Sequence, residues 1–205
     1  MPPVLTCLIG KRLGDPNVLS FNTTTHFELR DLSASLIGLI CRRFGETTHT
    51  LRPRLTRTCL KAFLDPSKPP GSHYGALIGL HAIGGKESVR VLIIPNLRLF
   101  EAVIRDGLQS EDELKKTESE NCMKAILAVL KSLEQEKGLW IGGGGADVDM
   151  MDYTNGNEDS GDGIPAALKM RLAAKVGELV AGEVCKMENR GLVEAILDGG
   201  AARGR

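Results

Sequence analysis

The feature that most constrains the fold is a block between Thr25 and Leu97 in which amphipathic helical patterns follow one another with connections of only a few residues. Apolar side chains recur in it every three or four positions, which is the period of a helix that buries one face. Aromatic residues make up only 4% of the chain, in keeping with helix-on-helix packing rather than a β-sandwich. The sequence therefore predicts an all-α fold, an α-solenoid of antiparallel helix pairs.

The most regular of the predicted helices begins at Thr25, which stands three residues before Glu28 at the spacing of a capping box. It ends at Phe44, and we expect Gly45 to form a left-handed cap. The positions predicted to face inward follow a 3.6-residue period. They are Leu29, Leu32, Leu36, Ile40 and Phe44.

Five further helices are predicted before residue 138, over about residues 4–13, 51–64, 72–84, 95–108 and 110–137. Gly75 and Gly79 are expected to allow close backbone approach in the fourth helix of the chain. The segment Val89–Ile94 is rich in β-branched residues, which favour a strand. A lone strand would have no partner, so we predict that this segment is helical.

Composition divides the chain into three parts. Residues 1–137 are predicted to form a helical-repeat domain, residues 138–163 a flexible acidic linker, and residues 164–205 a C-terminal helix with a short tail. The linker holds eight glycines and scattered aspartates without apolar periodicity. The last helix is predicted to run from Ile164 to about Arg190 and to pack on the solenoid or on a partner, with Gly191 as its cap.

No residue set has the pattern of a reaction centre, a metal site or a cofactor site. The five cysteines are widely spaced without a C-x-x-C pair, and the four histidines stand in no catalytic or zinc motif. Gly142–Gly145 lacks the Lys-Ser or Lys-Thr and the following helix of a phosphate loop, and the aspartates after it do not fit a calcium loop. We therefore predict no enzyme activity, no cofactor, no metal, no small-molecule substrate and no membrane span.

The net charge of zero hides a strong asymmetry, because residues 1–105 carry +7, residues 106–163 carry −9 and the remainder +2. Arg54, Arg57 and Lys61 recur at i, i+3 and i+7, so they share one helix face. The candidate partner-binding surface comprises Arg42, Arg43, Arg52, Arg54, Arg57 and Lys61. Such a face could contact an acidic protein segment or the phosphates of DNA, and a solvated outer face is an equally weighted alternative.

Six separated segments agree in order and spacing with a known family. They are Leu5-Thr6-Cys7-Leu8, His26-Phe27-Glu28-Leu29-Arg30-Asp31, Pro53-Arg54-Leu55-Thr56-Arg57-Thr58, Lys61-Ala62-Phe63-Leu64-Asp65-Pro66, His73-Tyr74-Gly75-Ala76 and Leu92-Ile93-Ile94-Pro95-Asn96-Leu97. Over about residues 4–108 the chain resembles the C-terminal HEAT-repeat domain of TATA-binding-protein-associated factor subunit 6 of general transcription factor TFIID, and a fungal origin is expected.

The resemblance implies a non-enzymatic nuclear scaffold that contacts other TFIID subunits, and SAGA subunits in fungi, and supports assembly of the RNA polymerase II pre-initiation complex. Nothing in the chain resembles the N-terminal histone fold of the family, so we expect a C-terminal fragment. The alternative function is a DNA-binding helical module that makes weak promoter contacts through phosphates, using the basic face.

Overall fold

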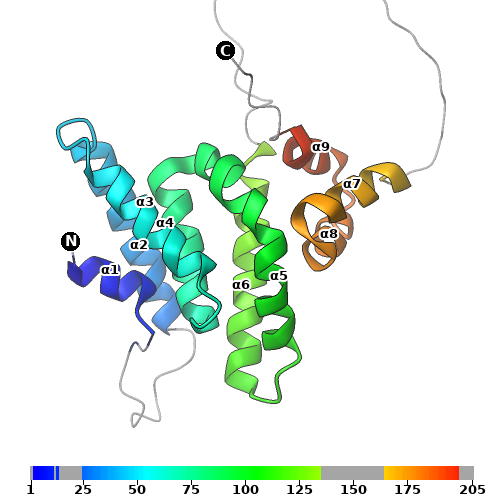
Figure 1. The fold of residues 1–205 in the computed structure, drawn as a ribbon, viewed down its shortest axis with the longest axis horizontal. Helices are drawn as coiled ribbons and strands as arrows, with labels where there is room; N and C mark the ends of the chain where they lie inside the picture. Colours follow the sequence, from blue (N-terminus) through cyan, green and yellow to red (C-terminus); the bar gives the residue numbers. More distant parts are fainter. Residues whose placement is uncertain (1, 12, 14–24, 135–163, 199–205) are drawn as a thin grey trace, which may run out of the picture.

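The structure is a computed structural model that describes residues 2–11, 13, 25–134 and 164–198. These residues form helices joined by short connections, with no strand among them (Figure 1). In chain order the helices are α1 (Pro2–Ile9), α2 (Thr25–Phe44), α3 (Leu51–Leu64), α4 (Pro70–Ser88), η1 (Val89–Ile93), α5 (Ile94–Leu108), α6 (Glu113–Lys131), α7 (Ala166–Val176), α8 (Glu178–Cys185) and α9 (Arg190–Asp198). The prediction of an all-α fold is confirmed.

The helices before residue 135 stack in two layers. One layer contains α2, α4 and α6, and α4 packs against both of the others. The second contains α1, α3 and α5, which lie against α2, α4 and α6 (Figure 1). Because His26 lies against Gly71 and Gly38 against Ala82, α2 and α4 run in the same direction. This arrangement is the predicted α-solenoid.

A continuous apolar core runs through the stack. Phe63 of α3, Leu80 of α4, Leu97 of α5 and Ile126 of α6 are each at most 1% exposed. Burying a side chain of this size contributes about 1.5–3 kcal/mol. The core therefore holds the layers together, and the charged residues described next fix how the helices are rotated.

Helix α2 has the predicted bounds, but the prediction of its inward face is wrong. Leu29, Leu32, Leu36 and Phe44 are 38%, 67%, 41% and 49% exposed. The buried residues are instead Phe27, Arg30, Ser33, Ala34, Ile37 and Cys41. Small residues explain why this face of α2 is the buried one. Ala34 and Gly38 let α4 approach closely, whereas a row of leucines would keep the two helices further apart.

Arg30 points inward because the C-terminal end of α1 needs hydrogen-bond donors. Its Nη1 donates to the carbonyl oxygen of Leu8 at 2.6 Å, and its Nη2 donates to that of Gly10 at 2.9 Å. Carbonyl groups in the last turn of a helix have no partner within the helix. Burial lowers the pKa of Arg30, and the nearby Glu118 opposes this effect.

Two glycines of α4 complete the junction with α1, as predicted. A Cβ atom on Gly75 would overlap the carbonyl oxygen of Leu8, and one on Gly79 would lie 2.7 Å from the Cδ2 atom of Leu8. The carboxylate of Glu118 extends the junction to α6, because its Oε2 atom accepts a hydrogen bond from the N–H of Gly71 at 3.2 Å. Close backbone approach is therefore a requirement at this point.

The C-terminal end of α2 is capped by a side chain from α3. The prediction of a left-handed Gly45 is wrong, because the described glycines with positive φ are Gly85 and Gly177. The Nε and Nη2 atoms of Arg52 both donate to the carbonyl oxygen of Cys41, each at 3.2 Å. A cation at a helix C-terminus also interacts favourably with the helix dipole.

The stretch after α4 is helical, as predicted, although it does not follow a regular α-helix. Residues 89–93 form a π-helical turn, and Gly85 just before it has φ 55° and ψ −142°. Pro95 lies in the first turn of α5, where the N–H that proline lacks would have had no partner. The β-branched residues are accommodated because Val89 and Ile93 are buried in the core.

The prediction of one long C-terminal helix is wrong. Gly177 adopts φ 94° and separates α7 from α8, and a third helix, α9, follows. Gly191 lies within α9 and therefore does not cap the preceding helix. The three helices pack on α5 and α6 at one end of the stack. The linker predicted over residues 138–163 lies outside the described residues.

Replacing Arg30 with leucine should lower the free energy of unfolding by about 3 kcal/mol, because the charge-assisted hydrogen bonds to the carbonyl groups of Leu8 and Gly10 are lost, and Gly10 keeps the hydroxyl of Ser72 as a donor. Urea denaturation followed by circular dichroism measures the change. Arg57→Leu, on an exposed part of α3, is the matched control and should change stability by less than about 0.5 kcal/mol. Equal effects of the two substitutions would contradict this account of Arg30.

The Arg52→Ala variant should lose about 1 kcal/mol of stability, because the carbonyl group of Cys41 loses the charge-assisted hydrogen bonds from the guanidinium and keeps the one from the N–H of Gly45. Arg54→Ala, two residues further along α3, tests the same change of residue type without that hydrogen bond. Thermal unfolding of both variants under identical buffer conditions compares them. A larger loss for Arg54→Ala would show that the capping role is misassigned.

Candidate protein-interaction surface

The six basic residues singled out from the sequence lie at the end of the stack where α2 meets α3. Arg42 and Arg43 occupy the last turn of α2 and are exposed. Arg54, Arg57 and Lys61 are exposed on α3. They share one face because the opposite face is buried, through Leu55, Cys59, Ala62 and Phe63.

Arg52 differs from the other five, because its guanidinium is engaged with the carbonyl group of Cys41. It joins α3 to α2 and is less able to reach a partner. The structure thus separates Arg52, an exposed arginine that joins two helices, from five other exposed basic side chains. Sequence spacing could not make this separation, since Arg52 and Arg54 differ by only two positions.

A second exposed feature adjoins Arg43 and was missed by the sequence analysis. The outer face of α2 carries four leucines at spacings of three, four and three residues, which we call the leucine row: Leu29, Leu32, Leu36 and Leu39. Leu32 and Leu39 are 67% and 54% exposed. This spacing is that of a seam between two packed helices, and it continues to Arg43. The signal was visible in the sequence but was assigned to the core.

A small apolar cavity of about 220 Å³ lies between α1 and α3, beside the basic side chains. Leu5, Leu51 and Leu55 line it, with Arg54 and three threonines also on its wall. The cavity could hold an apolar side chain of a bound segment while Arg54 meets a neighbouring carboxylate. No sequence pattern indicates this cavity, because its walls come from separate helices.

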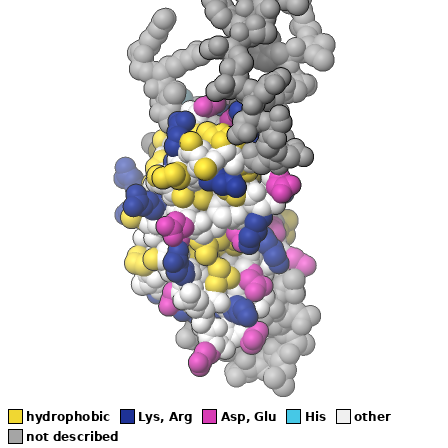
Figure 2. Space-filling view, turned by 90° about the vertical axis from the view of Figure 1, so that its right-hand side faces the viewer, with side chains coloured by type: hydrophobic (Ala, Val, Ile, Leu, Met, Phe, Trp, Pro, Cys, Tyr) yellow, Lys and Arg dark blue, Asp and Glu magenta, His cyan; other side chains and the backbone are white. Residues whose placement is uncertain are grey.

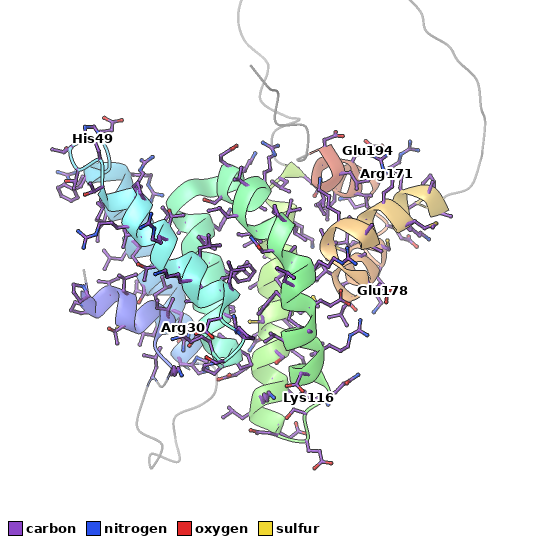
Figure 3. The ribbon with its side chains drawn as sticks, viewed as in Figure 1. Arg30, His49, Lys116, Arg171, Glu178 and Glu194 are labelled. Carbon is purple, nitrogen blue, oxygen red and sulfur yellow. The ribbon has the colours of Figure 1, made fainter. Side chains whose placement is uncertain are left out.

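The titratable residues do not assemble into a catalytic arrangement in the described part of the chain. His49 lies at the tip of the α2–α3 connection, far from Arg30 and from Glu178 (Figure 3). The Nδ1 atom of His73 lies 3.1 Å from the carbonyl oxygen of Phe63, and burial lowers the pKa of this histidine. His73 is thus held in the core by its neighbours, whereas His49 lies apart at the tip of a connection.

The buried cysteines are packed residues. The Sγ atom of Cys122 donates to the carbonyl oxygen of Pro70 at 3.1 Å, and burial raises its pKa far above the ordinary value. Burial also raises the pKa of Cys59 to about 12. Both thiols therefore stay protonated at neutral pH and are poor nucleophiles.

Within the described residues, no group of three or more His, Cys, Asp or Glu side chains is placed to hold a metal ion. No helix of this part is both long and apolar enough to cross a membrane. The two surface features described above are basic and apolar, respectively. Surfaces of that kind recognise other macromolecules.

Comparison with known proteins gives relatives of one type. The chain is 46% identical over 138 residues to the SAGA complex/transcription factor TFIID complex subunit Taf6 of Schizosaccharomyces pombe, which covers 67% of this chain and 29% of that protein. It is 42% identical over 132 residues to transcription initiation factor TFIID subunit 6 of Arabidopsis thaliana, covering 64% of this chain and 23% of the relative.

A more distant relative, transcription initiation factor TFIID subunit 6 of Drosophila melanogaster, is 33% identical over 108 residues, or 53% of this chain and 17% of the relative. The chain thus spans less than a third of the length of each of these proteins. The TAF6 C-terminal HEAT repeat domain matches residues 1–98. That range contains α1 to α4, where the stacked pairs and the basic face lie. The resemblance to the TAF6 C-terminal HEAT repeat domain family is therefore confirmed over residues 1–98, just under half of the chain.

Proposed function

We propose that the chain is the helical-repeat part of a nuclear transcription-complex subunit, of the TFIID and SAGA type, and that it acts as a non-enzymatic scaffold. The observation that carries the proposal is the leucine row on the outer face of α2. The names of the relatives supply the setting, since they are subunits of TFIID and, in fission yeast, of SAGA. In that setting the scaffold supports assembly of the pre-initiation complex.

The leucine row is too apolar and too regular to serve as an ordinary solvated surface. Its four side chains lie along one stripe of α2, each at least 38% exposed. Scattered single apolar residues are normal on protein surfaces, whereas contiguous apolar patches mark sites of interaction. A stripe with alternating spacings of three and four residues fits another helix laid along it.

The position of α2 within the stack also favours a helix as the occupant. On its inner side α2 packs against α4, and α4 packs in turn against α6. The leucine row lies on the opposite side of α2, where a further helix would extend the same layer. An amphipathic helix from elsewhere in the assembled complex would thus make a contact of the kind that α2 already makes with α4.

The charges beside the row favour an acidic partner. Arg42 and Arg43 follow the row at the end of α2, and Arg54, Arg57 and Lys61 present a basic face on α3. Charge complementarity of this kind contributes mainly to specificity and to the association rate. The expected partner segment therefore combines leucine-class side chains with nearby glutamates or aspartates.

The double variant Leu32→Glu/Leu36→Glu should lose the partner without losing the fold, because both side chains are already exposed. The matching segment of fission yeast Taf6 is replaced by this chain, and the tagged protein is purified. Mass spectrometry should show co-purified subunits reduced at least about tenfold, which is the effect of losing roughly 1.4 kcal/mol of binding energy. Leu64→Glu/Leu114→Glu, also at exposed leucines, should retain them. An unchanged amount of co-purified subunits with Leu32→Glu/Leu36→Glu would reject the leucine row as a contact.

Reversing the charge of Arg54, Arg57 and Lys61 to Glu should also weaken assembly, by about tenfold at low salt and less at high salt, because exposed charges are screened. The control reverses three exposed lysines of α6: Lys116, Lys124 and Lys131. Both triple variants change the net charge equally. The same loss with both would show a general charge effect and would argue against a specific basic face.

A further inference from the structure

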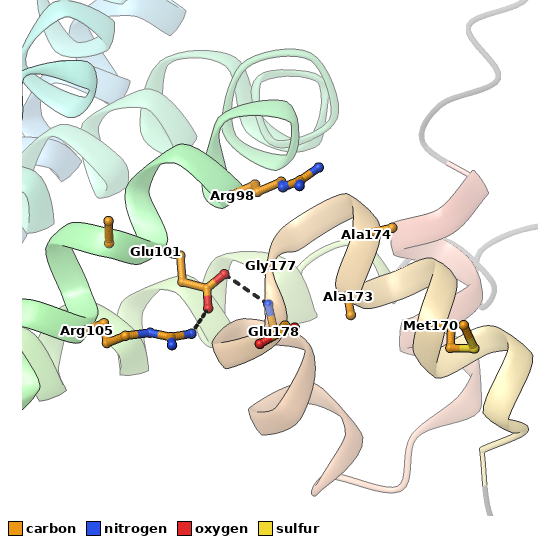
Figure 4. A pocket seen from close by; sticks show the side chains of 9 residues that line it. Arg98, Glu101, Arg105, Met170, Ala173, Ala174, Gly177 and Glu178 are labelled. Atoms are coloured by element: carbon orange, nitrogen blue, oxygen red, sulfur yellow. Dashed lines mark hydrogen bonds and ion pairs between the residues drawn. The ribbon is translucent and has the colours of Figure 1, made fainter.

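A groove of about 630 Å³ lies between α5 and the α7–α8 corner, at the other end of the stack from the leucine row (Figure 4). Small residues form much of its wall: Ala102 on α5, and Ala173, Ala174 and Gly177 on the C-terminal side. Arg98, Arg105 and Met170 line it as well. Arg98 is the last residue of the family match over residues 1–98, and the other residues that line the groove lie beyond that match.

The carboxylate of Glu101 holds the groove in shape at the end where α8 begins. Its Oε2 atom accepts from the N–H of Glu178 and its Oε1 atom from the N–H of Leu179, both at 3.0 Å. Burial raises the pKa of Glu101, but the hydrogen bonds from Leu179 and Arg105 outweigh it and leave the pKa below its ordinary value. A Cβ atom on Gly177 would overlap this carboxylate. The two walls are therefore fixed relative to each other.

The small side chains leave room for a helix to approach the backbone closely. Met170, which is 74% exposed, stands at the edge of the groove with a flexible thioether that adapts to different partners. Leu99 on the neighbouring face of α5 is 72% exposed. Figure 2 shows this side of the molecule, where hydrophobic side chains lie among both basic and acidic side chains. The apolar part of the groove is thus open to a partner.

The rim of the groove is mainly basic. Helix α7 has no acidic residue and carries the exposed Lys169 and Arg171 on either side of its groove-lining face, whereas Lys175 donates to the carbonyl oxygen of Leu197 at 2.7 Å. Of the two acidic side chains on the groove wall, Glu101 is engaged with α8 and Arg105, and Glu178 stands at the far end. Arg98 has no hydrogen-bond or ion-pair partner among the described residues. A positively charged partner would therefore be disfavoured.

We propose that the groove binds an amphipathic helix of a partner protein, with its apolar face against the alanines and Met170 and with acidic side chains toward Arg98 and the rim of α7. Arg98 and Arg105 lie seven residues apart on α5, or roughly 10 Å along the helix axis, so they span about two turns of a helix laid beside them. Helix-in-groove recognition of this kind uses apolar anchors at three- and four-residue spacing.

The test uses two synthetic helical peptides that carry leucines every three or four residues and differ only in their flanking residues, glutamate in one and lysine in the other. Fluorescence anisotropy measures binding to the full chain. The methyl NMR signal of Met170, assigned with Met170→Leu, reports whether binding occurs in the groove. The glutamate peptide should bind and shift this signal, and the lysine peptide should bind at least about tenfold more weakly.

Two substitutions should weaken binding of the glutamate peptide. Ala174→Trp fills the groove and should abolish binding, and Arg98→Glu should weaken it about tenfold. The matched controls are Ala128→Trp and Lys124→Glu on the exposed face of α6, which should bind like the unmodified chain. Circular dichroism of every variant verifies the fold. All binding measurements use the chain that carries Leu32→Glu/Leu36→Glu, so that a peptide bound at the leucine row of α2 does not contribute.

Equal binding of both peptides, or unchanged binding to Ala174→Trp, would overturn the proposal. A doubled molecular mass in light scattering that falls to the monomer value in Ala174→Trp would assign the groove to a second copy of the chain instead. Peptide binding that appears only after Asp147, Asp149 and Asp152 are changed to Asn would show that the acidic segment of the same chain competes for the groove. Either result rejects a partner helix as the occupant.

Discussion

The arrangement of the stack depends on the buried guanidinium of Arg30. It supplies donors to the carbonyl groups of Leu8 and Gly10 at the end of α1, at the point where α1, α2 and α4 meet. Gly75 belongs to the same junction, because any side chain there would displace the carbonyl of Leu8. With Arg30 facing inward, the opposite side of α2 must face outward. The interaction that joins three helices therefore also exposes the leucine row.

Charged side chains form hydrogen bonds with the free backbone groups at several helix ends of the molecule. Arg52 binds the carbonyl group of Cys41 near the end of α2, and Glu101 accepts the free N–H groups at the start of α8. Asp112 caps α6 through the N–H of Leu114 at 3.0 Å. Cations meet carbonyl ends and anions meet N–H ends, as the helix dipole requires. These hydrogen bonds fix the positions of helices that the apolar core alone would leave free to rotate or slide.

The two surfaces left exposed are suited to different contacts. The leucine row and the basic side chains near it lie where α2 meets α3, whereas the alanine-lined groove lies between α5 and α7. Each combines an apolar strip with positive charge, so each favours helical segments that carry acidic residues. A solenoid with a contact at either end can connect two neighbours in an assembly. This is the property expected of a scaffold and needs no reaction centre.

Periodicity alone determined the helices of the stack, including the bounds of Thr25–Phe44 and Leu51–Leu64, and the exposed charges on α3 followed from their spacing. It could not determine how α2 is rotated, because both faces of that helix carry apolar residues at helical spacing. Only the tertiary structure decided this, since the inward face is the one whose Arg30 reaches the unpaired carbonyl groups of α1. The capping role of Arg52 and the break at Gly177 were hidden for the same reason. Each depends on atoms from another helix, and one-dimensional spacing carries no information about them.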